Sequence, residues 1–210
     1  PYKNCTIGYY CPAGTITPGI SPSAVCQEGT SCTLGSSSES NCPPGSYQPN
    51  KEQDVCLDCP VGYFCTGNGN SDYTICPAGS YCPGNTTSGS SFLCPAGTYS
   101  DTEGLEKESD CTPCDSGFYC AGTGNTEVTG PCSAGYYCIS AAEVANPNDG
   151  LTGDICPQNN YCPEESKLPT SCNLGFSTTL PGQTTSASCI ACPAGQYCAS
   201  NVDGVTYCDP

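Results

Sequence analysis

Residues 76–82 read Cys-Pro-Ala-Gly-Ser-Tyr-Cys, and residues 192–198 read Cys-Pro-Ala-Gly-Gln-Tyr-Cys. Looser versions of this stretch recur along the chain with five residues between the two cysteines. Three further cysteines begin in the same way but are followed by a longer stretch before the next cysteine. The eleven motifs, numbered here in chain order, start at Cys5, Cys26, Cys42, Cys59, Cys76, Cys94, Cys114, Cys132, Cys156, Cys172 and Cys192. The chain is therefore an internal repeat.

The fourth position of the motif is glycine in every copy except motif 9, where it is Asn159. Glycine and asparagine are the residues that most readily adopt a positive φ, so this position predicts a requirement of the backbone. Proline follows the first cysteine in six motifs, and its fixed φ suits the second position of a β-turn. We therefore expect each motif to form a tight turn that reverses the chain.

An aromatic residue precedes the closing cysteine in seven of the eight short motifs. We expect this ring to cover a disulfide and the edge of the next motif, where it supplies apolar area. A row of exposed rings that stacks sugars is the alternative. The seven residues are Tyr10, Phe64, Tyr81, Tyr119, Tyr137, Tyr161 and Tyr197.

The composition decides how such a chain can be held together. Leu, Ile, Val and Phe together number 26 of 210 residues, whereas cysteine numbers 23. So few apolar residues cannot offset the entropy of ordering the chain, while a cysteine share above about 8–10% indicates disulfides. We predict a small disulfide-rich fold of tandem short β-hairpin modules in an elongated rod, with very little helix and no conventional hydrophobic core.

The same totals exclude several classes of function. The chain has no His and no Arg, so a Ser-His-Asp triad, a Cys-His pair and a histidine zinc site cannot be built. Four Lys against 20 acidic residues give a net charge of −16, which repels nucleic acid and anionic lipid. No apolar run of about 18 residues occurs. We predict no enzyme, no cofactor, no metal site, no nucleic-acid partner and no membrane span in this segment.

Three Cys-x-x-Cys pairs need a separate interpretation: Cys56 with Cys59, Cys111 with Cys114, and Cys189 with Cys192. In the cytosol such pairs are typical of zinc or thioredoxin-like sites. Here they are part of a longer cysteine series, and no helical periodicity accompanies them. Disulfides in an oxidising compartment are therefore the favoured interpretation, with zinc as the alternative, and the expected location is extracellular or at the cell surface.

Two pairing schemes fit the cysteines, because connectivity cannot be deduced from spacing. Both close the long motifs as Cys42–Cys56, Cys94–Cys111 and Cys172–Cys189. The local scheme also closes each short motif on itself. The interleaved scheme is preferred because crossing bonds would couple neighbouring turns, and it pairs Cys59–Cys76, Cys65–Cys82, Cys114–Cys132 and Cys120–Cys138.

The spacing divides the chain into four parts: a partial repeat at 1–41, a repeat at 42–93, a repeat at 94–171 and a truncated repeat at 172–210. The third part has an insert at 139–155 and an extra element at Cys156–Cys162. Since the chain opens without a leader sequence, we expect it to be a segment of a longer array. Cys208 is then expected to pair beyond the segment or with another molecule.

Residues 42–59 (CPPGSYQPNKEQDVCLDC) and 94–114 (CPAGTYSDTEGLEKESDCTPC) resemble the cysteine-rich ephrin-receptor-like repeat. That repeat is similar in appearance to the modules of tumour necrosis factor receptors and to EGF-like modules. Arrays with Cys-Pro-x-Gly-x-Tyr-Cys doublets also look like surface and flagellar-hair (mastigoneme-type) proteins of protists and algae. The resemblance implies small β-hairpin modules in an extended extracellular stalk, without catalysis.

Two sequons predict N-linked glycans, at Asn85 and at Asn4. The second has a cysteine as its middle residue, which would hinder modification once bridged. The stretch at 146–154 (NPNDGLTGD) has oxygen ligands for calcium but lacks EF-hand spacing, so a solvated loop is the favoured interpretation.

These observations predict a structural, non-catalytic segment of a cell-surface stalk, coat or filament that associates with other copies of itself or with adjacent repeats. The alternative is a receptor-like or adhesion module that binds a protein or glycan ligand. For that alternative, the insert at 139–155 and the extra element at Cys156–Cys162 are the expected docking place, because the repeat is least regular there.

Overall fold

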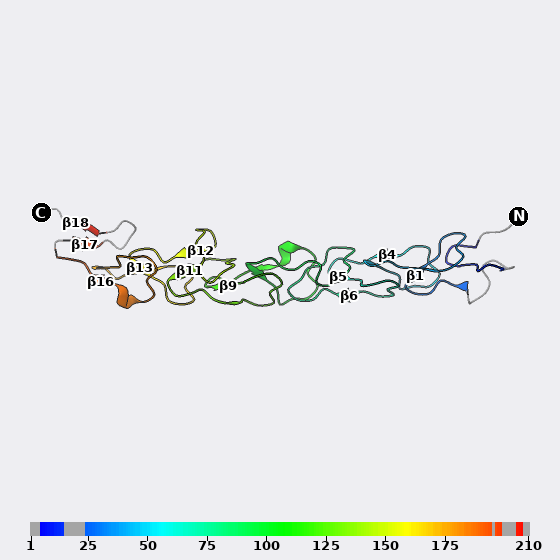
Figure 1. Ribbon diagram of the computed structural model, residues 1–210, viewed down its shortest axis with the longest axis horizontal. Coiled ribbons are helices and arrows are strands. Elements are labelled where there is room, and N and C mark those ends of the chain that lie inside the picture. Colours follow the sequence, from blue (N-terminus) through cyan, green and yellow to red (C-terminus); the bar gives the residue numbers. More distant parts are fainter. Residues whose placement is uncertain (1–4, 15–23, 195, 199–204, 208–210) are drawn as a thin grey trace. The chain divides into compact units, whose positions relative to one another are not determined.

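The computed structural model describes residues 5–14, 24–194, 196–198 and 205–207 (Figure 1). Within these residues the strands are two or three residues long and form nine two-stranded antiparallel sheets. The described residues contain no α-helix, and two 3-10 helices, η2 (Glu108–Asp110) and η3 (Ser186–Ser188), have three residues each. The prediction of small disulfide-rich β-hairpin modules is confirmed. No helix among these residues is long and apolar enough to cross a bilayer.

Each sheet pairs the residues just after a motif's glycine position with the residues just before the next motif's first cysteine. In motif 3, for example, Tyr47 lies opposite Leu57 and Ser46 opposite Asp58. The strand pairs are β1 (Thr30–Ser31) with β2 (Ser40–Asn41), β3 (Ser46–Tyr47) with β4 (Leu57–Asp58), β5 (Tyr63–Phe64) with β6 (Thr74–Ile75), β7 (Thr98–Tyr99) with β8 (Thr112–Pro113), β9 (Phe118–Tyr119) with β10 (Gly130–Pro131), β11 (Tyr136–Cys138) with β12 (Gly153–Ile155), β13 (Asn160–Tyr161) with β14 (Thr170–Ser171), β15 (Phe176–Ser177) with β16 (Ile190–Ala191), and β17 (Gln196–Cys198) with β18 (Val205–Tyr207).

The expected tight turn is present in motifs 1 to 10. The residue after the first cysteine accepts a hydrogen bond from the amide three residues later, as Pro77 does from Ser80 at 3.2 Å. The glycines at the fourth motif position have φ between 75° and 88°, and Asn159 has φ 66°. The predicted positive φ is confirmed for the described copies, and Gly195 lies outside them. We expected proline at the second position of this turn, and that prediction is wrong. Proline is the first residue of the turn, and the glycine is its third residue, as in a type II turn.

Motifs 1 to 10 each contain a second turn that the sequence pattern did not reveal. It follows the closing cysteine, or the equivalent residue of a long motif, and again places one residue at positive φ, between 53° and 90°. In motifs 1 to 10 these residues are Gly14, Gly35, Glu52, Gly69, Asn85, Gly104, Gly124, Ala141, Glu165 and Gly182. Every described non-glycine residue with positive φ occupies one of the two turn positions, so these conformations are part of the repeat.

Backbone hydrogen bonds join motifs 1 to 5 in sequence and motifs 6 to 9 in sequence, and the first pair uses the glycine of the first turn. In motif 4 the amide of Gly62 donates to the carbonyl of Cys82 in motif 5 at 2.8 Å, and the carbonyl of Gly62 accepts from the amide of Cys76 at 2.9 Å. One peptide unit on each side of the glycine is therefore satisfied by the neighbouring motif rather than by water.

A second pair of bonds connects the second turns. The amide of Cys65 donates to Thr86 at 3.0 Å, and the amide of Asn85 donates to the carbonyl of Cys59 at 2.9 Å. The same four bonds link motifs 1 to 5 in sequence, and motifs 6 to 9 in sequence. We call this recurring set of four bonds the ladder.

The chain forms two compact units. Unit 1 comprises residues 1–93 and 102–111, and unit 2 comprises residues 94–101 and 112–210. The ladder through motifs 1 to 5 belongs to unit 1, and the ladder through motifs 6 to 9 belongs to unit 2. The sequence-based boundaries at residues 42, 94 and 172 stay predictions.

Buried sulfur occupies the place of an aliphatic core. Among the described residues, the buried apolar side chains are cysteines except for Ala24, Leu105 and Ala142. This confirms the prediction that no conventional hydrophobic core forms. In unit 2 the ring of Tyr119 packs against Cys132 and Cys138, which form the disulfide of the next motif, as expected for the aromatic position.

The disulfides are local, and the preferred interleaved scheme is wrong. The Cα atoms of the paired cysteines lie 5.6 to 6.1 Å apart, within the range that a disulfide spans. Crossing bonds are unnecessary because the ladder already couples neighbouring motifs. Cys94 and Cys111 are both disulfide-bonded, and Cys208 lies outside the described residues. The pairs are Cys5–Cys11, Cys26–Cys32, Cys42–Cys56, Cys59–Cys65, Cys76–Cys82, Cys114–Cys120, Cys132–Cys138, Cys156–Cys162, Cys172–Cys189 and Cys192–Cys198.

Candidate functional site

The first-turn glycine also contacts the motif two places further along the chain. In unit 2, a Cβ atom on Gly97 of motif 6 would lie 2.4 Å from the carbonyl oxygen of Ala141 in motif 8. In unit 1, a Cβ on Gly62 would lie 2.7 Å from the oxygen of Gly104. The glycine is therefore needed for two independent reasons, its positive φ and the space for this carbonyl. The same relation holds for Gly8, Gly29, Gly45, Gly117 and Gly135, at 2.3 to 2.7 Å.

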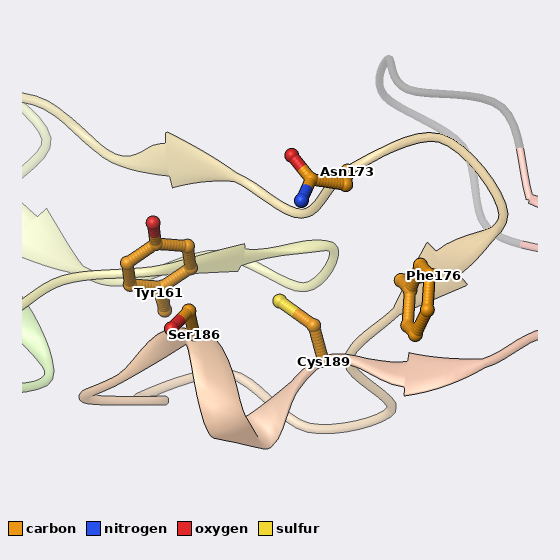
Figure 2. A pocket seen from close by; sticks show the side chains of 5 residues that line it. All are labelled: Tyr161, Asn173, Phe176, Ser186 and Cys189. Atoms are coloured by element: carbon orange, nitrogen blue, oxygen red, sulfur yellow. The ribbon is translucent and has the colours of Figure 1, made fainter.

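A surface pocket of about 230 Å³ lies in unit 2, where motif 9 meets the long loop of motif 10. Figure 2 shows Tyr161 and Ser186 at one end of the pocket and Phe176 at the other, with the Asn173 amide and the Cys189 sulfur pointing toward the space between them. Tyr161 belongs to β13, Phe176 to β15 and Ser186 to η3.

The side chains that line this pocket carry no charge. Cys189 is disulfide-bonded to Cys172, so it offers no thiolate nucleophile. Tyr161, Asn173 and Ser186 supply hydroxyl and amide groups, and Phe176 supplies an apolar ring that is 45% exposed. Such a set can donate and accept hydrogen bonds and offer an aromatic face.

The insert at 139–155 forms a hairpin loop rather than an irregular excursion. Its strand β12 pairs with β11, which places Cys138 opposite Gly153. Asp149 shapes the loop, because its carboxylate accepts hydrogen bonds from the amides of Leu151 at 2.8 Å and Thr152 at 2.7 Å. The Thr152 hydroxyl also donates to this carboxylate, and together these bonds lower the pKa of Asp149 to about 2.

The same contacts bear on the calcium alternative. The Asp149 carboxylate is engaged by donors of its own loop, as in a solvated Asx-type turn. Within the described residues, no group of three or more His, Cys, Asp and Glu side chains is arranged to hold a metal ion. The cysteines of the Cys-x-x-Cys pairs are bonded to other cysteines in disulfides, so they offer no thiolate to a zinc ion.

Asn85, the better of the two sequons, is the positive-φ residue of the second turn of motif 5, and its side chain is exposed. Its amide nitrogen faces the carbonyl of Gly45 at 3.1 Å and the carboxylate of Asp58 at 2.9 Å. Thr86 is buried, with its hydroxyl donating to Pro83, whereas Thr87 is exposed. Glycosylation at Asn85 stays a prediction, and Asn4 lies outside the described residues.

Several surface rings of unit 1 pack against one another. Tyr73 meets Tyr47 edge to face, with ring centroids 5.1 Å apart, and it meets Tyr63 at 4.6 Å. Aromatic residues just before closing cysteines, such as Tyr10 and Phe64, are half-buried. Tyr63 and Tyr73 do not precede a closing cysteine, but Tyr81 does, and its ring centroid lies 5.6 Å from that of Phe92. This contact supports the packing interpretation of the aromatic position in unit 1.

Sequence reasoning did not find the pocket. Motif 10 differs from the other two long motifs by Asn173 in place of proline and by Phe176 in place of Ser46 and Thr98, but several short motifs share these features, so the pattern carried no clear signal. The expected docking place, the extra element Cys156–Cys162, does contribute Tyr161 to the pocket. No residue between 139 and 155 lines it.

A comparison with models of known protein families finds no match for this chain, and a search of curated proteins finds no similar sequence.

Proposed function

We propose that this chain is a structural, non-catalytic extracellular repeat segment, and that its motifs stack into a stalk or filament of a cell surface. The observation that carries the proposal is the ladder, in which the same four backbone bonds pass from motif to motif. Units that bond mainly to their neighbours add length without adding a new kind of contact. The local disulfides support an oxidising location, since they replace the core.

Small-angle X-ray scattering of the 210-residue chain tests this proposal. A compact globule of this length has a radius of gyration of about 17 Å, and an unfolded chain one of about 49 Å. A stack of motifs is expected to fall between these values and to show the cross-sectional scattering of a rod. A radius of gyration near that of the globule would contradict the stalk. If the rod-like scattering disappears on dilution, the rod is formed by association between copies and not by the single chain.

A receptor-like or adhesion role is the second candidate, and the irregular region of unit 2 favours it. The insert at 139–155 presents Leu151 at 82% exposure, and the ladder between motifs 8 and 9 is complete despite the insert. A chain that replaces residues 143–152 by a short Gly-Ser linker is therefore expected to keep its fold. Loss of binding to cell surfaces by this variant, with unchanged scattering, would favour adhesion over a purely structural role.

A further inference from the structure

We propose that the pocket formed by Tyr161, Asn173, Phe176, Ser186 and Cys189 binds one ring of a neutral sugar. This inference rests on the second proposed function, for which it names a ligand class and a place. The stalk proposal does not depend on it.

The charge of the lining selects a neutral ligand. All five side chains are uncharged, and none of the four Lys of the chain lines the pocket. An anionic ligand would need a cation, which the pocket lacks, and it would also be repelled by the net charge of −16. A metal ion would need carboxylates, which the pocket also lacks. A small neutral molecule is the class that remains.

The shapes and polar groups of the lining fit a sugar ring. A pyranose has apolar C–H groups on its faces and hydroxyls around its edge. Phe176 offers an aromatic face, while Tyr161 and Ser186 supply hydroxyls, and the Asn173 amide both donates and accepts. The polar side-chain atoms of Tyr161, Asn173 and Ser186 have no hydrogen-bond partner among the described residues, so they are available to a ligand.

The size of the pocket limits the ligand to one ring. Its volume of about 230 Å³ is roughly the share of seven or eight water molecules in liquid water. It is also open to solvent, so a bound ring would keep part of its hydration. We therefore expect a dissociation constant on the order of 1 mM, which multivalent display on an array of chains would strengthen.

Two of the residues that line this pocket distinguish motif 10 from the other two long motifs. Motifs 3 and 6 have Pro43 and Pro95 where motif 10 has Asn173, and they have Ser46 and Thr98 where it has Phe176. The turn itself is the same, because Phe176 donates to the Asn173 carbonyl at 3.0 Å, as Ser46 donates to Pro43 at 3.1 Å. The turn therefore does not require Asn173 or Phe176, so both can be replaced to test the pocket without changing the turn.

Nuclear magnetic resonance titration of the full 210-residue chain tests the inference. The probes are the methyl glycosides of glucose, galactose, mannose and N-acetylglucosamine, each up to about 50 mM, well above the expected dissociation constant. At least one probe should cause saturable shifts at the amides of Tyr161, Phe176 and Ser186. The absence of saturable shifts with every probe would overturn the inference, as would shifts confined to other residues, although the latter would leave a glycan-adhesion role standing.

Variants that restore the repeat provide the second readout. Asn173→Pro and Phe176→Ser each introduce the residue found at the same position of motif 3, so both should fold, and each should weaken binding at least tenfold. Leu174→Ser is the matched control, because Leu174 is 77% exposed in the same turn and does not line the pocket. Unchanged affinity in both restoring variants, or an equal loss in the control, would refute the pocket. Ser186→Ala offers a further test should a restoring variant lose the native spectrum.

Discussion

Replacing Gly97 by alanine tests the contact between a motif and the motif two places away. Alanine at φ +77° costs about 1–2 kcal/mol, because its Cβ crowds the backbone in the left-handed region. Its Cβ would also lie 2.4 Å from the oxygen of Ala141, and Ala141 is held by its amide's bond to the carbonyl of Cys114 at 2.9 Å. Overpacking of this kind costs about 1–3 kcal/mol. The total expected destabilisation is about 2–5 kcal/mol.

Gly175→Ala is the matched control in the same unit. Gly175 has φ +83°, but a Cβ there would meet no heavy atom of the described residues within 4 Å. Only the conformational cost of about 1–2 kcal/mol then applies. The entropy that alanine removes from the unfolded chain is similar at both positions, so it cancels in the comparison.

Native-state hydrogen exchange measures the two costs locally. The reporter for Gly97 is the amide of Cys114, which donates to the Gly97 carbonyl at 2.8 Å, and the reporter for Gly175 is the amide of Cys192, at 2.9 Å. Exchange at Cys114 should become faster by roughly 30-fold to several thousand-fold, and at Cys192 by about 5- to 30-fold. Equal acceleration in the two variants, or a smaller effect at Cys114, would show that the carbonyl contact contributes nothing to stability.

Three further predictions follow from the turns and the sulfur pairs. Asn159→Gly and Asn159→Ala both remove the side-chain oxygen that accepts a hydrogen bond from the Ser177 hydroxyl, so the difference between them isolates the backbone conformation. In thermal unfolding Asn159→Ala should be less stable than Asn159→Gly by about 1–2 kcal/mol, because glycine tolerates φ 66° and alanine does not; equal melting temperatures would contradict this. The folded pKa of Asp149 is about 2, below its ordinary value, so ionised Asp149 stabilises the insert loop above pH 4 and this support is lost as the pH falls from about 4 to 2. A carboxyl-carbon titration with a midpoint near 4 would refute that assignment. Non-reducing peptic digestion should yield fragments joined within one motif, such as Cys59–Cys65, and a fragment joining Cys59 to Cys76 would restore the interleaved scheme.

The hairpin fold was predictable because its determinants are short-range. Ten glycines at one motif position and a single asparagine indicate a positive φ, and Asn159 indeed adopts φ 66°. The lack of aliphatic residues likewise forces cysteine into the core, where Cys26 and Cys76 are fully buried. Each of these conclusions needs only a local conformation or a composition.

The second turn escaped prediction because its residues do not share a type. Glu52, Ala141 and Glu165 occupy the positive-φ position in three motifs, and glycine occupies it in others. Contacts with the preceding motif hold these residues in place, since the amide of Glu165 donates to the carbonyl of Cys132 at 3.0 Å. Tertiary bonds can thus stabilise a conformation that the side chain itself disfavours.

The pairing of the cysteines failed for a related reason. The interleaved scheme was preferred because crossing covalent bonds would couple neighbouring motifs into a stiffer rod. The structure couples them through main-chain groups, which every residue has and no sequence pattern displays. The pocket escaped for a different reason, since the chemistry of Asn173 and Phe176 becomes recognisable only when Tyr161 and Ser186 are known to lie beside them.

Every bond of the ladder joins a cysteine, a residue equivalent to a closing cysteine, a first-turn glycine or a second-turn residue, whereas the segment from the second turn to the following strand takes no part in it. One such segment, at 143–152, is longer than the others, yet the ladder bonds beside it are intact. The amide of Gly135 donates to the carbonyl of Cys162, and the amide of Cys156 donates to the carbonyl of Gly135, both at 2.8 Å. The corresponding segments at 71–72 and 167–169 should therefore accept grafted peptides of about ten residues, provided that Tyr73 keeps its contacts with Tyr47 and Tyr63. The chain offers a scaffold on which foreign epitopes can be displayed at regular intervals without redesign of their support.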